Sequence, residues 1–235
     1  MVTIENLHKK YGKNKVLKGV NLTINNSGII AVLGPNGSGK TTLIKSILGM
    51  VIPQQGSITI NGTSIKRNWQ YRKEIDYLPQ IANFPGNLSV KELIKMIKDL
   101  RNKPANDQEL IAYFKLENFL DKKLINLSGG TKQKVNLVLT FMFDSPLVIL
   151  DEPTSGLDPI SLIRLKEWIF KEKAKGKTIL ITSHIMSFVE EIAEDIIFIL
   201  EGKIYFNGSV SELKTQTGQT DFEHAIATIL TENHV

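Results

Sequence analysis

The feature that most constrains this chain is the segment Gly34–Thr41, whose sequence is Gly-Pro-Asn-Gly-Ser-Gly-Lys-Thr. It matches the pattern G-x-x-x-x-G-K-S/T and lies between an apolar run, Gly28–Leu33, and a helical pattern, Thr41–Leu48. Glycines let backbone N–H groups curve around phosphate oxygens, and the start of the following helix adds its positive dipole. The sequence therefore predicts a strand, a loop that binds nucleotide phosphates, and a helix.

Two side chains of this loop have predicted tasks of their own. We expect Lys40 to reach the β- and γ-phosphates, and the Thr41 hydroxyl to bind Mg²⁺. The nucleotide-binding residues predicted from the loop and its helix are Gly34, Pro35, Asn36, Gly37, Ser38, Gly39, Lys40, Thr41 and Thr42.

A pair of adjacent carboxylates follows a second apolar run. Leu147–Leu150 predicts a buried strand that ends in Asp151 and Glu152. Side chains alternate along a strand, so we expect Asp151 to hold Mg²⁺ and Glu152 to orient and deprotonate the water that attacks the γ-phosphate. Acids at a strand end are also often a solvated turn, here leading into Pro153, but the phosphate loop elsewhere in the chain favours the catalytic interpretation.

A third segment, Leu127–Thr131, has the sequence Leu-Ser-Gly-Gly-Thr and precedes a helical pattern that extends to Phe143. Ser128 and the bare backbone of Gly129 and Gly130 predict an anion-binding helix start. Such residues are also common in ordinary loops and helix caps, so alone they are a weak signal. Together with the phosphate loop they predict a second phosphate contact.

Composition excludes several kinds of chemistry. The chain has 235 residues, is 42% hydrophobic and contains no cysteine, which excludes disulfides, thiol catalysis and thiolate metal sites. No apolar run approaches the ~18 residues of a membrane-spanning helix. Met1–Glu5 lacks the features of a secretory signal. We expect a soluble, cytoplasmic protein.

The formal net charge is +5, and lysines concentrate near Lys9–Lys18 and Lys171–Lys177. Such clusters could face an anionic membrane surface or nucleic acid, but a solvated lysine-rich surface is the commoner explanation. We expect no nucleic-acid partner.

The order of the patterns predicts the architecture. From about Ile81 to Ser145 the pattern is helical, and after Pro146 strands and helices alternate. This alternation implies parallel pairing in an α/β core, so we predict one domain with a mostly α insert. The tail Ser211–Leu230 is predicted to be helical and peripheral.

The phosphate loop, Leu-Ser-Gly-Gly, Asp-Glu and a later histidine, His184, resemble in this order the nucleotide-binding domain of ATP-binding-cassette proteins. The resemblance covers nearly the whole chain. It implies an α/β fold with a P-loop NTPase (RecA-like) core, an N-terminal antiparallel β region and an inserted α-helical subdomain. The core would comprise residues 1–80 and 146–235, and the helical subdomain residues 81–145.

The resemblance also implies a head-to-tail dimer with two ATP molecules at its interface. Ser128, Gly129 and Gly130 of one copy would then contact the γ-phosphate bound by the other copy. Every residue that hydrolysis needs is present, so a symmetric homodimer with two active sites is possible.

Four more residues occupy family positions. Tyr11 lies where an aromatic ring stacks on adenine, although it could be an ordinary strand-end aromatic. Gln80 lies where a glutamine senses Mg²⁺ and the membrane partner, although it could be a surface polar residue. Asp158 belongs to the loop that links the two ATP sites, and His184 would contact the γ-phosphate. The predicted catalytic residues are thus Glu152, His184, Lys40 and Gln80, the metal ligands are Thr41, Gln80 and Asp151, and the ATP contacts outside the loop are Tyr11, Ser128, Gly129, Gly130 and Asp158.

One residue departs from the family pattern, and three histidines lie outside it. Lys134 stands where the family commonly has arginine, which would alter local salt bridging without abolishing closure around ATP. The other histidines, His8, His224 and His234, have no such setting and are interpreted as incidental.

Two kinds of cassette protein fit these residues. The first is a transporter motor on the cytoplasmic face of a membrane, whose helical insert grips a separate transmembrane permease subunit. The second is a soluble cassette ATPase, such as a metal-cluster assembly factor; a DNA-maintenance cassette is disfavoured because no sustained heptads separate Lys40 from Ser128.

Among transporters, Gly156–Pro159 and a short tail with Phe222–Ala225 resemble the exporters whose membrane subunits are separate six-helix proteins. The chain also faintly resembles the copper-processing ATPase of nitrous oxide reductase maturation, with multidrug, lipid, polysaccharide and haem-linked exporters as rivals. No residue identifies the transported substrate.

Overall fold

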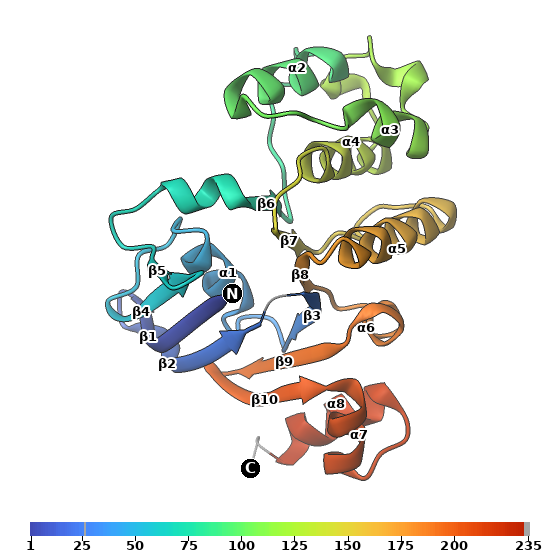
Figure 1. The fold of residues 1–235 in the computed structure, drawn as a ribbon. Coiled ribbons are helices and arrows are strands. Elements are labelled where there is room, and N and C mark those ends of the chain that lie inside the picture. The colour runs from blue at the N-terminus through green and yellow to red at the C-terminus, as the bar shows by residue number, and fades with distance from the viewer. Residues whose placement is uncertain (26, 233–235) are drawn as a thin grey trace. The chain divides into compact units, whose positions relative to one another are not determined.

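The computed structural model describes residues 1–25 and 27–232. These residues form two compact units (Figure 1). The first unit comprises Met1–Arg72 and Thr178–Val235, and the second comprises Lys73–Lys177. The P-loop lies in the first unit, and the Asp-Glu and Ser-Gly-Gly segments lie in the second.

The first unit contains an antiparallel sheet with the strand order β2-β1-β4-β5. Val2 of β1 pairs with Ile24 of β2 on one side and with Ile60 of β4 on the other. β1 therefore lies between β2 and β4 in the sheet. This sheet confirms the predicted N-terminal antiparallel β region. Its strands are β1 (Val2–Tyr11), β2 (Asn14–Ile24), β4 (Gln55–Ile60) and β5 (Thr63–Ser64).

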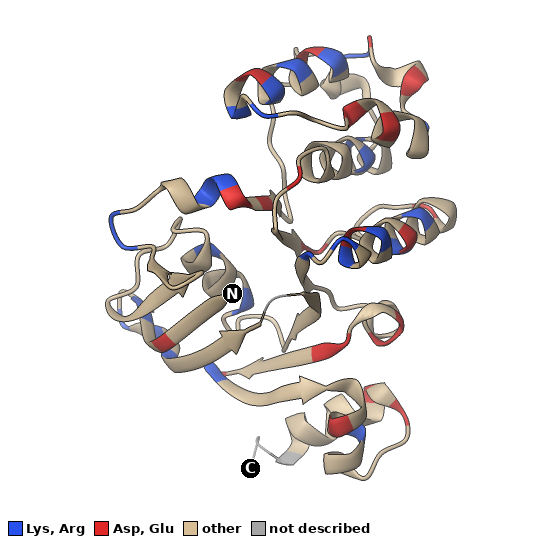
Figure 2. Cartoon of the chain, viewed as in Figure 1, with Lys and Arg blue, Asp and Glu red and all other residues tan. Residues whose placement is uncertain are grey.

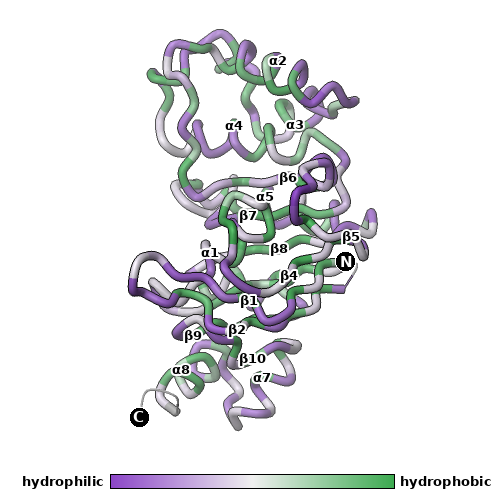
Figure 3. The backbone as a smooth tube through the Cα atoms, turned by 90° about the vertical axis from the view of Figure 1, so that its left-hand side faces the viewer, coloured by the Kyte–Doolittle hydropathy of each residue, from purple (hydrophilic) through white to green (hydrophobic). Residues whose placement is uncertain are grey.

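The first unit also contains the parallel strands that carry the P-loop. β3 (Gly28–Leu33) pairs in parallel with β8 (Thr178–Thr182) and with β9 (Asp195–Leu200). All residues of β3 and β8 are buried. A parallel strand that is covered on both faces is expected to be apolar throughout, and Figure 3 shows β8 as a hydrophobic segment. A turn at Glu201 and Gly202, with φ of 47° and 80°, leads into the antiparallel β10 (Lys203–Ser209).

The C-terminal tail is helical, as predicted, but part of it is buried. Gly218 adopts a left-handed conformation (φ 65°) and ends the first of two separate helices. The second is not peripheral, because Phe222 and Ala225 are fully buried. The helices of the first unit are α1 (Lys40–Ile47), α6 (Met186–Ile192), α7 (Val210–Thr217) and α8 (Phe222–Glu232).

The second unit combines two parallel strands with four helices. β6 (Ile75–Leu78) and β7 (Leu147–Asp151) pair in register from Ile75 opposite Leu147 to Leu78 opposite Leu150. Three of the helices lie within the predicted α insert. The helices are α2 (Val90–Arg101), α3 (Asp107–Tyr113), α4 (Gly129–Phe141) and α5 (Pro159–Ala174), and the short 3-10 helices of the chain are η1 (Gln70–Glu74), η2 (Glu117–Phe119) and η3 (Leu124–Asn126).

A buried ion pair ties α2 to β6. The Arg101 guanidinium donates to Asp76 Oδ1 at 2.6 Å and to the Ser145 hydroxyl at 3.2 Å. Burial raises the pKa of Asp76 to about 6, outweighing the opposing charge of Arg101. The folded chain therefore binds a proton at Asp76 more tightly than the unfolded chain does.

This raised pKa predicts a pH dependence of stability. Because the folded pKa is the higher one, the contribution of Asp76 is fully present below about pH 4 and is lost as the pH rises through about 6. We expect the free energy of unfolding of the wild type, minus that of Asp76→Asn, to fall by about 1–3 kcal/mol over this window. Urea unfolding across the window measures the difference, and parallel curves for the two chains would contradict it.

Candidate nucleotide-binding site

The P-loop is a tight connection between β3 and α1. The Ser38 amide donates to the Pro35 carbonyl at 3.2 Å, which closes a turn within the loop. The Lys40 ammonium folds back over this turn and donates to the carbonyls of Gly34 (2.7 Å) and Pro35 (3.0 Å). A lysine held in this position can exchange carbonyl oxygens for phosphate oxygens without leaving the loop.

Backbone from distant parts of the chain encloses the loop. A Cβ on Gly34, where φ is 145°, would lie 2.0 Å from the Ile199 carbonyl oxygen, and one on Gly39 would lie 2.9 Å from Leu17. The Gly202 amide donates to the Ser38 carbonyl at 3.0 Å. The roles of Ile199 and Gly202 were not predicted, and their only local signal in the sequence is the turn-forming Glu-Gly pair.

This enclosure predicts a large effect of a single methyl group. Gly34→Ala must displace the β9 backbone, so we expect it to lower the free energy of unfolding by about 3 kcal/mol or more and to abolish ATP binding. Gly12→Ala is the matched control, because Gly12 also has a positive φ of 57° but open space around its Cβ position. Gly12→Ala should lower the free energy of unfolding by about 1 kcal/mol. Denaturant unfolding and a fluorescent-ATP titration check both variants, and equal effects would refute the steric argument.

The loop is suited to an anion. Ser38 is 3% exposed, and none of the described residues hydrogen-bonds its hydroxyl. The N-cap of α1 is Gly39, which offers no side-chain cap, and the first turn has no acidic residue, so the positive end of the helix is not neutralised locally. An unpartnered hydroxyl, an uncapped helix start and a lysine ammonium fit the phosphates of ATP.

Two further predicted residues lie in the same unit. Tyr11 is half exposed at the end of β1, and the Lys9 ammonium lies 4.9 Å from its ring centroid while donating to the Ile52 carbonyl at 2.7 Å. The hairpin of Tyr11 continues into β2, where Val16 and Leu17 contact Gly39. His184 is exposed two residues after β8.

The remaining histidines have other surroundings. His8 hydrogen-bonds Asn6 at 2.9 Å, and His224 lies 3.4 Å from Asp221 on the surface. His234 lies outside the described residues.

In the second unit, the carboxylates and Gln80 gather at one edge. Leu78 of β6 pairs with Leu150 of the parallel strand β7. Gln80 lies two positions after Leu78 and Glu152 two positions after Leu150, so both residues follow the carboxyl ends of neighbouring strands. Asp151 and Glu152 are 3% and 5% exposed. Burial raises the pKa of Tyr77 to about 12, and the nearby charge of Asp151 adds to the shift.

The Ser-Gly-Gly segment forms the start of α4. The Ser128 hydroxyl accepts a hydrogen bond from the Thr131 amide at 3.3 Å, as expected of an N-cap. Ser128 and Gly129 are exposed, and a Cβ on Gly129 would meet nothing within 4 Å. A Cβ on Gly130 would lie 2.6 Å from the Gly156 carbonyl oxygen. The two glycines therefore differ: the first leaves a bare surface, and the second permits close packing.

Lys134 links α4 to the loop of Asp158. Its ammonium lies 2.9 Å from Asp158 Oδ2. The Asp158 carboxylate also caps α5, accepting from the amide (2.9 Å) and hydroxyl (2.8 Å) of Ser161. The Lys134 hydrogen bond and these two bonds hold the pKa of Asp158 well below its usual range. A lysine in place of arginine thus keeps a salt bridge at this position.

The lysine cluster 171–177 is paired with carboxylates. Lys171 contacts Glu109, Lys175 lies 2.6 Å from Glu172, and Lys177 contacts both Glu172 and Asp144. Figure 2 shows acidic and basic residues interspersed along α5. Lys177 and Glu172 are 5% and 1% exposed, so this end of the cluster is a buried ion pair, whereas the paired Lys171 and Lys175 fit an ordinary protein surface.

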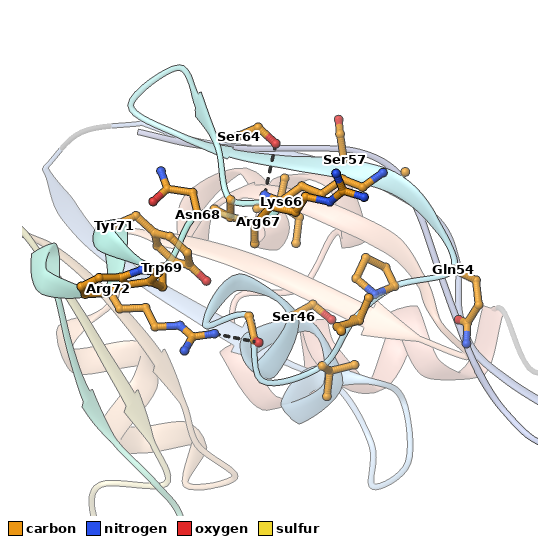
Figure 4. Close-up of a pocket in the computed structure, with 17 residues that line it drawn as sticks. Ser46, Gln54, Ser57, Ser64, Lys66, Arg67, Asn68, Trp69, Tyr71 and Arg72 are labelled. Atoms are coloured by element: carbon orange, nitrogen blue, oxygen red, sulfur yellow. Dashed lines mark hydrogen bonds between the residues drawn. The ribbon is translucent and has the colours of Figure 1, made fainter.

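A cavity of about 560 Å³ in the first unit was not predicted (Figure 4). Ile52 and Trp69, both mostly exposed, contribute apolar lining. Lys66, Arg67 and Arg72 add three positive charges, and Figure 4 shows the first two lying close together. The available sequence signal was a tryptophan, Trp69, within three positions of Lys66, Arg67 and Arg72.

These features define a P-loop nucleotide-binding protein, and comparison with known proteins gives its family. The ABC transporter family model matches residues 17–155, and a model of an AAA domain matches residues 123–190. A lantibiotic transport ATP-binding protein of Streptococcus pyogenes is 37% identical over 87% of this chain and 89% of its own length. A lipopolysaccharide export system ATP-binding protein of Haemophilus influenzae is 32% identical over 91% and 92%. A solved ATP-binding subunit of an ABC transporter superposes with a TM-score of 0.91 at 28% identity, covering 98% of this chain and 99% of that one.

The chain belongs to the ATP-binding-cassette family and is an ATP-binding, ATP-hydrolysing subunit of the ABC transporter type. The predicted family and P-loop fold are confirmed. The fainter likeness to copper-processing ATPases stays a prediction. Within the described residues, no helix is long and apolar enough to span a bilayer.

Proposed function

We propose that this chain is the motor subunit of an exporter, which dimerises around two Mg-ATP and drives a separate transmembrane subunit on the cytoplasmic face of a membrane. The observation that carries the proposal is the exposed start of α4. Ser128 and Gly129 present a capped helix N-terminus with a bare backbone, which is a second anion site besides the P-loop. One chain binds one ATP at its P-loop, so the anion site at the start of α4 is explained if it contacts the ATP that is bound to another copy of the chain.

Each proposed role follows from the position of the residue. Lys40 and the loop amides hold the phosphates, and Tyr11 stacks on adenine. Glu152, at the end of a buried strand, orients and deprotonates the attacking water, while His184 contacts the γ-phosphate. Asp158 stabilises the link between the two ATP sites.

Three of the predicted side chains carry the oxygen donors that Mg²⁺ takes. The Thr41 hydroxyl follows the P-loop lysine, and Gln80 and the Asp151 carboxylate lie at the edge formed by β6 and β7. We propose these three side chains as the residues that hold the ion. When bound, Mg²⁺ neutralises charge on the β- and γ-phosphates.

The helical insert offers a place for the membrane subunit. A groove of about 260 Å³ is lined by Phe84, Ile125 and Val135, and Ile125 is 70% exposed. Exposed apolar residues beside a groove are typical of a surface that binds an amphipathic helix. The names of the relatives, which include lantibiotic transport and lipopolysaccharide export, support an export role.

The larger cavity in the first unit supports a second contact with the same partner. Its apolar lining and its three cations, Lys66, Arg67 and Arg72, are complementary to an acidic segment with an apolar side chain. We expect a triple charge reversal at these positions to lower affinity for the membrane subunit about tenfold or more without changing ATP hydrolysis by the isolated chain. Pull-down with the co-expressed membrane subunit measures the first effect, and unchanged affinity would remove this contact.

ATP-driven dimerisation tests the role of Ser128 across the dimer. The Glu152→Gln chain, in which hydrolysis is blocked, should become a dimer in saturating Mg-ATP when measured by light scattering. Adding Ser128→Arg should leave ATP binding intact, because the P-loop is unchanged, yet keep the chain monomeric. A double variant that still dimerises would show that Ser128 does not act across the interface.

Membrane association separates the transporter from the soluble alternative. A tagged chain should sediment with the membranes of its own cells, and Ile125→Asp should release it while ATP hydrolysis continues. A chain that stays in the soluble fraction with its membrane subunit co-expressed would instead favour a soluble cassette ATPase, such as a metal-cluster assembly factor.

A further inference from the structure

The turn that carries Glu152 has an unfavourable backbone. Glu152 has a φ of 54°, in the left-handed region that non-glycine residues seldom adopt, and it is 5% exposed. Such a conformation is strained and persists only where neighbouring contacts hold it. The next residue, Pro153, has no backbone N–H and so cannot donate a stabilising hydrogen bond.

A side chain from α4 holds this turn. Gln133 is 8% exposed, and its Nε2 donates to the Pro153 carbonyl at 2.9 Å. The orientation of the amide is itself set, because Asn136 Nδ2 donates to Gln133 Oε1 at 3.4 Å. Within the turn, the Ser155 amide donates to the Glu152 carbonyl at a longer 3.3 Å. The buried bond from Gln133 therefore fixes the Pro153–Thr154 peptide, the second one after Glu152.

We infer that Gln133 is a positioning residue for hydrolysis, holding the Glu152 carboxylate where it meets the attacking water. The inference rests on the proposed catalytic role of Glu152 and deepens it. An error of about 1 Å in the placement of a reacting group is enough to lower a rate about a hundredfold, so a single buried bond has a measurable effect.

The same helix carries the exposed anion site, which gives the bond a second consequence. Ser128 caps α4 five positions before Gln133. Close packing of Gly130 on Gly156 and the Lys134–Asp158 ion pair join the helix to the rest of the turn. A phosphate that engages the start of α4 would therefore act on a segment that these contacts connect to the turn of Glu152 in the same chain.

The test replaces Gln133 by methionine, which has similar length but no donor. In the full chain we expect Gln133→Met to lower kcat for ATP hydrolysis about tenfold to a hundredfold, with KM for ATP within about threefold of wild type. Thr140→Val is the matched control. Thr140 is buried on the same helix, but its hydroxyl bonds the helix carbonyl of Asn136 at 2.8 Å and not the turn. The control should retain wild-type kcat.

A second variant separates positioning from packing. In Gln133→Glu, the side chain donates to Pro153 only when it is protonated, so kcat relative to wild type should recover as the pH is lowered. Circular dichroism establishes at each pH that the variant is folded. A purely structural residue would give a loss that follows the folded fraction and not the pH.

The outcomes distinguish this inference from the proposed function. Wild-type kcat in folded Gln133→Met, or an equal loss in Thr140→Val, would overturn the positioning role. If Glu152→Gln itself hydrolyses ATP at the wild-type rate, the assignment of Glu152 fails first. An inactive Glu152→Gln with a fully active Gln133→Met would leave the proposed function in place and remove only the inference.

Discussion

Glu152→Gln is expected to lower ATP hydrolysis about a thousandfold while leaving ATP affinity within a few-fold of wild type. The substitution keeps the size of the side chain and removes its ability to accept a proton. Glu152 is nearly fully buried and has a left-handed backbone conformation at the end of β7. Because we expect the P-loop to hold the phosphates, ground-state binding should persist.

Steady-state phosphate release and a fluorescent-ATP titration measure these two effects. Glu201→Gln is the matched control, since Glu201 also has a positive φ, of 47°, but is exposed in the turn between β9 and β10. We expect wild-type hydrolysis from the control. Comparable hydrolysis by both variants would mean that another group activates the water, and a large loss of ATP affinity in Glu152→Gln would mean that the carboxylate acts in binding.

The strand, loop and helix around the P-loop could be predicted because their signals are local. A continuous apolar run gave β3 its bounds, Gly28–Leu33, which the structure reproduces. Helix ends were harder to predict where side chains cap them. α5 begins at Pro159, because Asp158 caps the helix and proline suits its first position, and neither residue is an apolar signal.

The contacts that complete the site could not be predicted, because they join segments far apart in the sequence. Gly202 stabilises the P-loop from a turn more than 150 residues later, and Gln133 holds a turn 20 positions away. Neither residue belongs to a local pattern that distinguishes it from an ordinary turn glycine or helix glutamine. The two glycines after Ser128 likewise look equivalent in the sequence, although one is exposed and the other is closely packed.

These two glycines give the second large effect, and they separate folding from function. Gly130→Ala should lower the free energy of unfolding by about 2 kcal/mol or more, because its Cβ would collide with the Gly156 carbonyl oxygen, 2.6 Å away. Gly129→Ala meets open space on a helix, where alanine is the better helix former by about 1 kcal/mol, so stability should be equal or higher.

Hydrolysis should nevertheless fall in Gly129→Ala, by about tenfold to a hundredfold, if the bare backbone at this position receives the γ-phosphate of a second copy. Adding Gly129→Ala to the Glu152→Gln chain should raise the ATP concentration needed for dimerisation by a similar factor, measured by light scattering against the Glu152→Gln chain alone. A loss of function without a loss of stability is the result that a folding defect cannot produce. Full activity and dimerisation in a stable Gly129→Ala chain would mean that nothing closes over this surface, and the start of α4 would then be an ordinary helix cap.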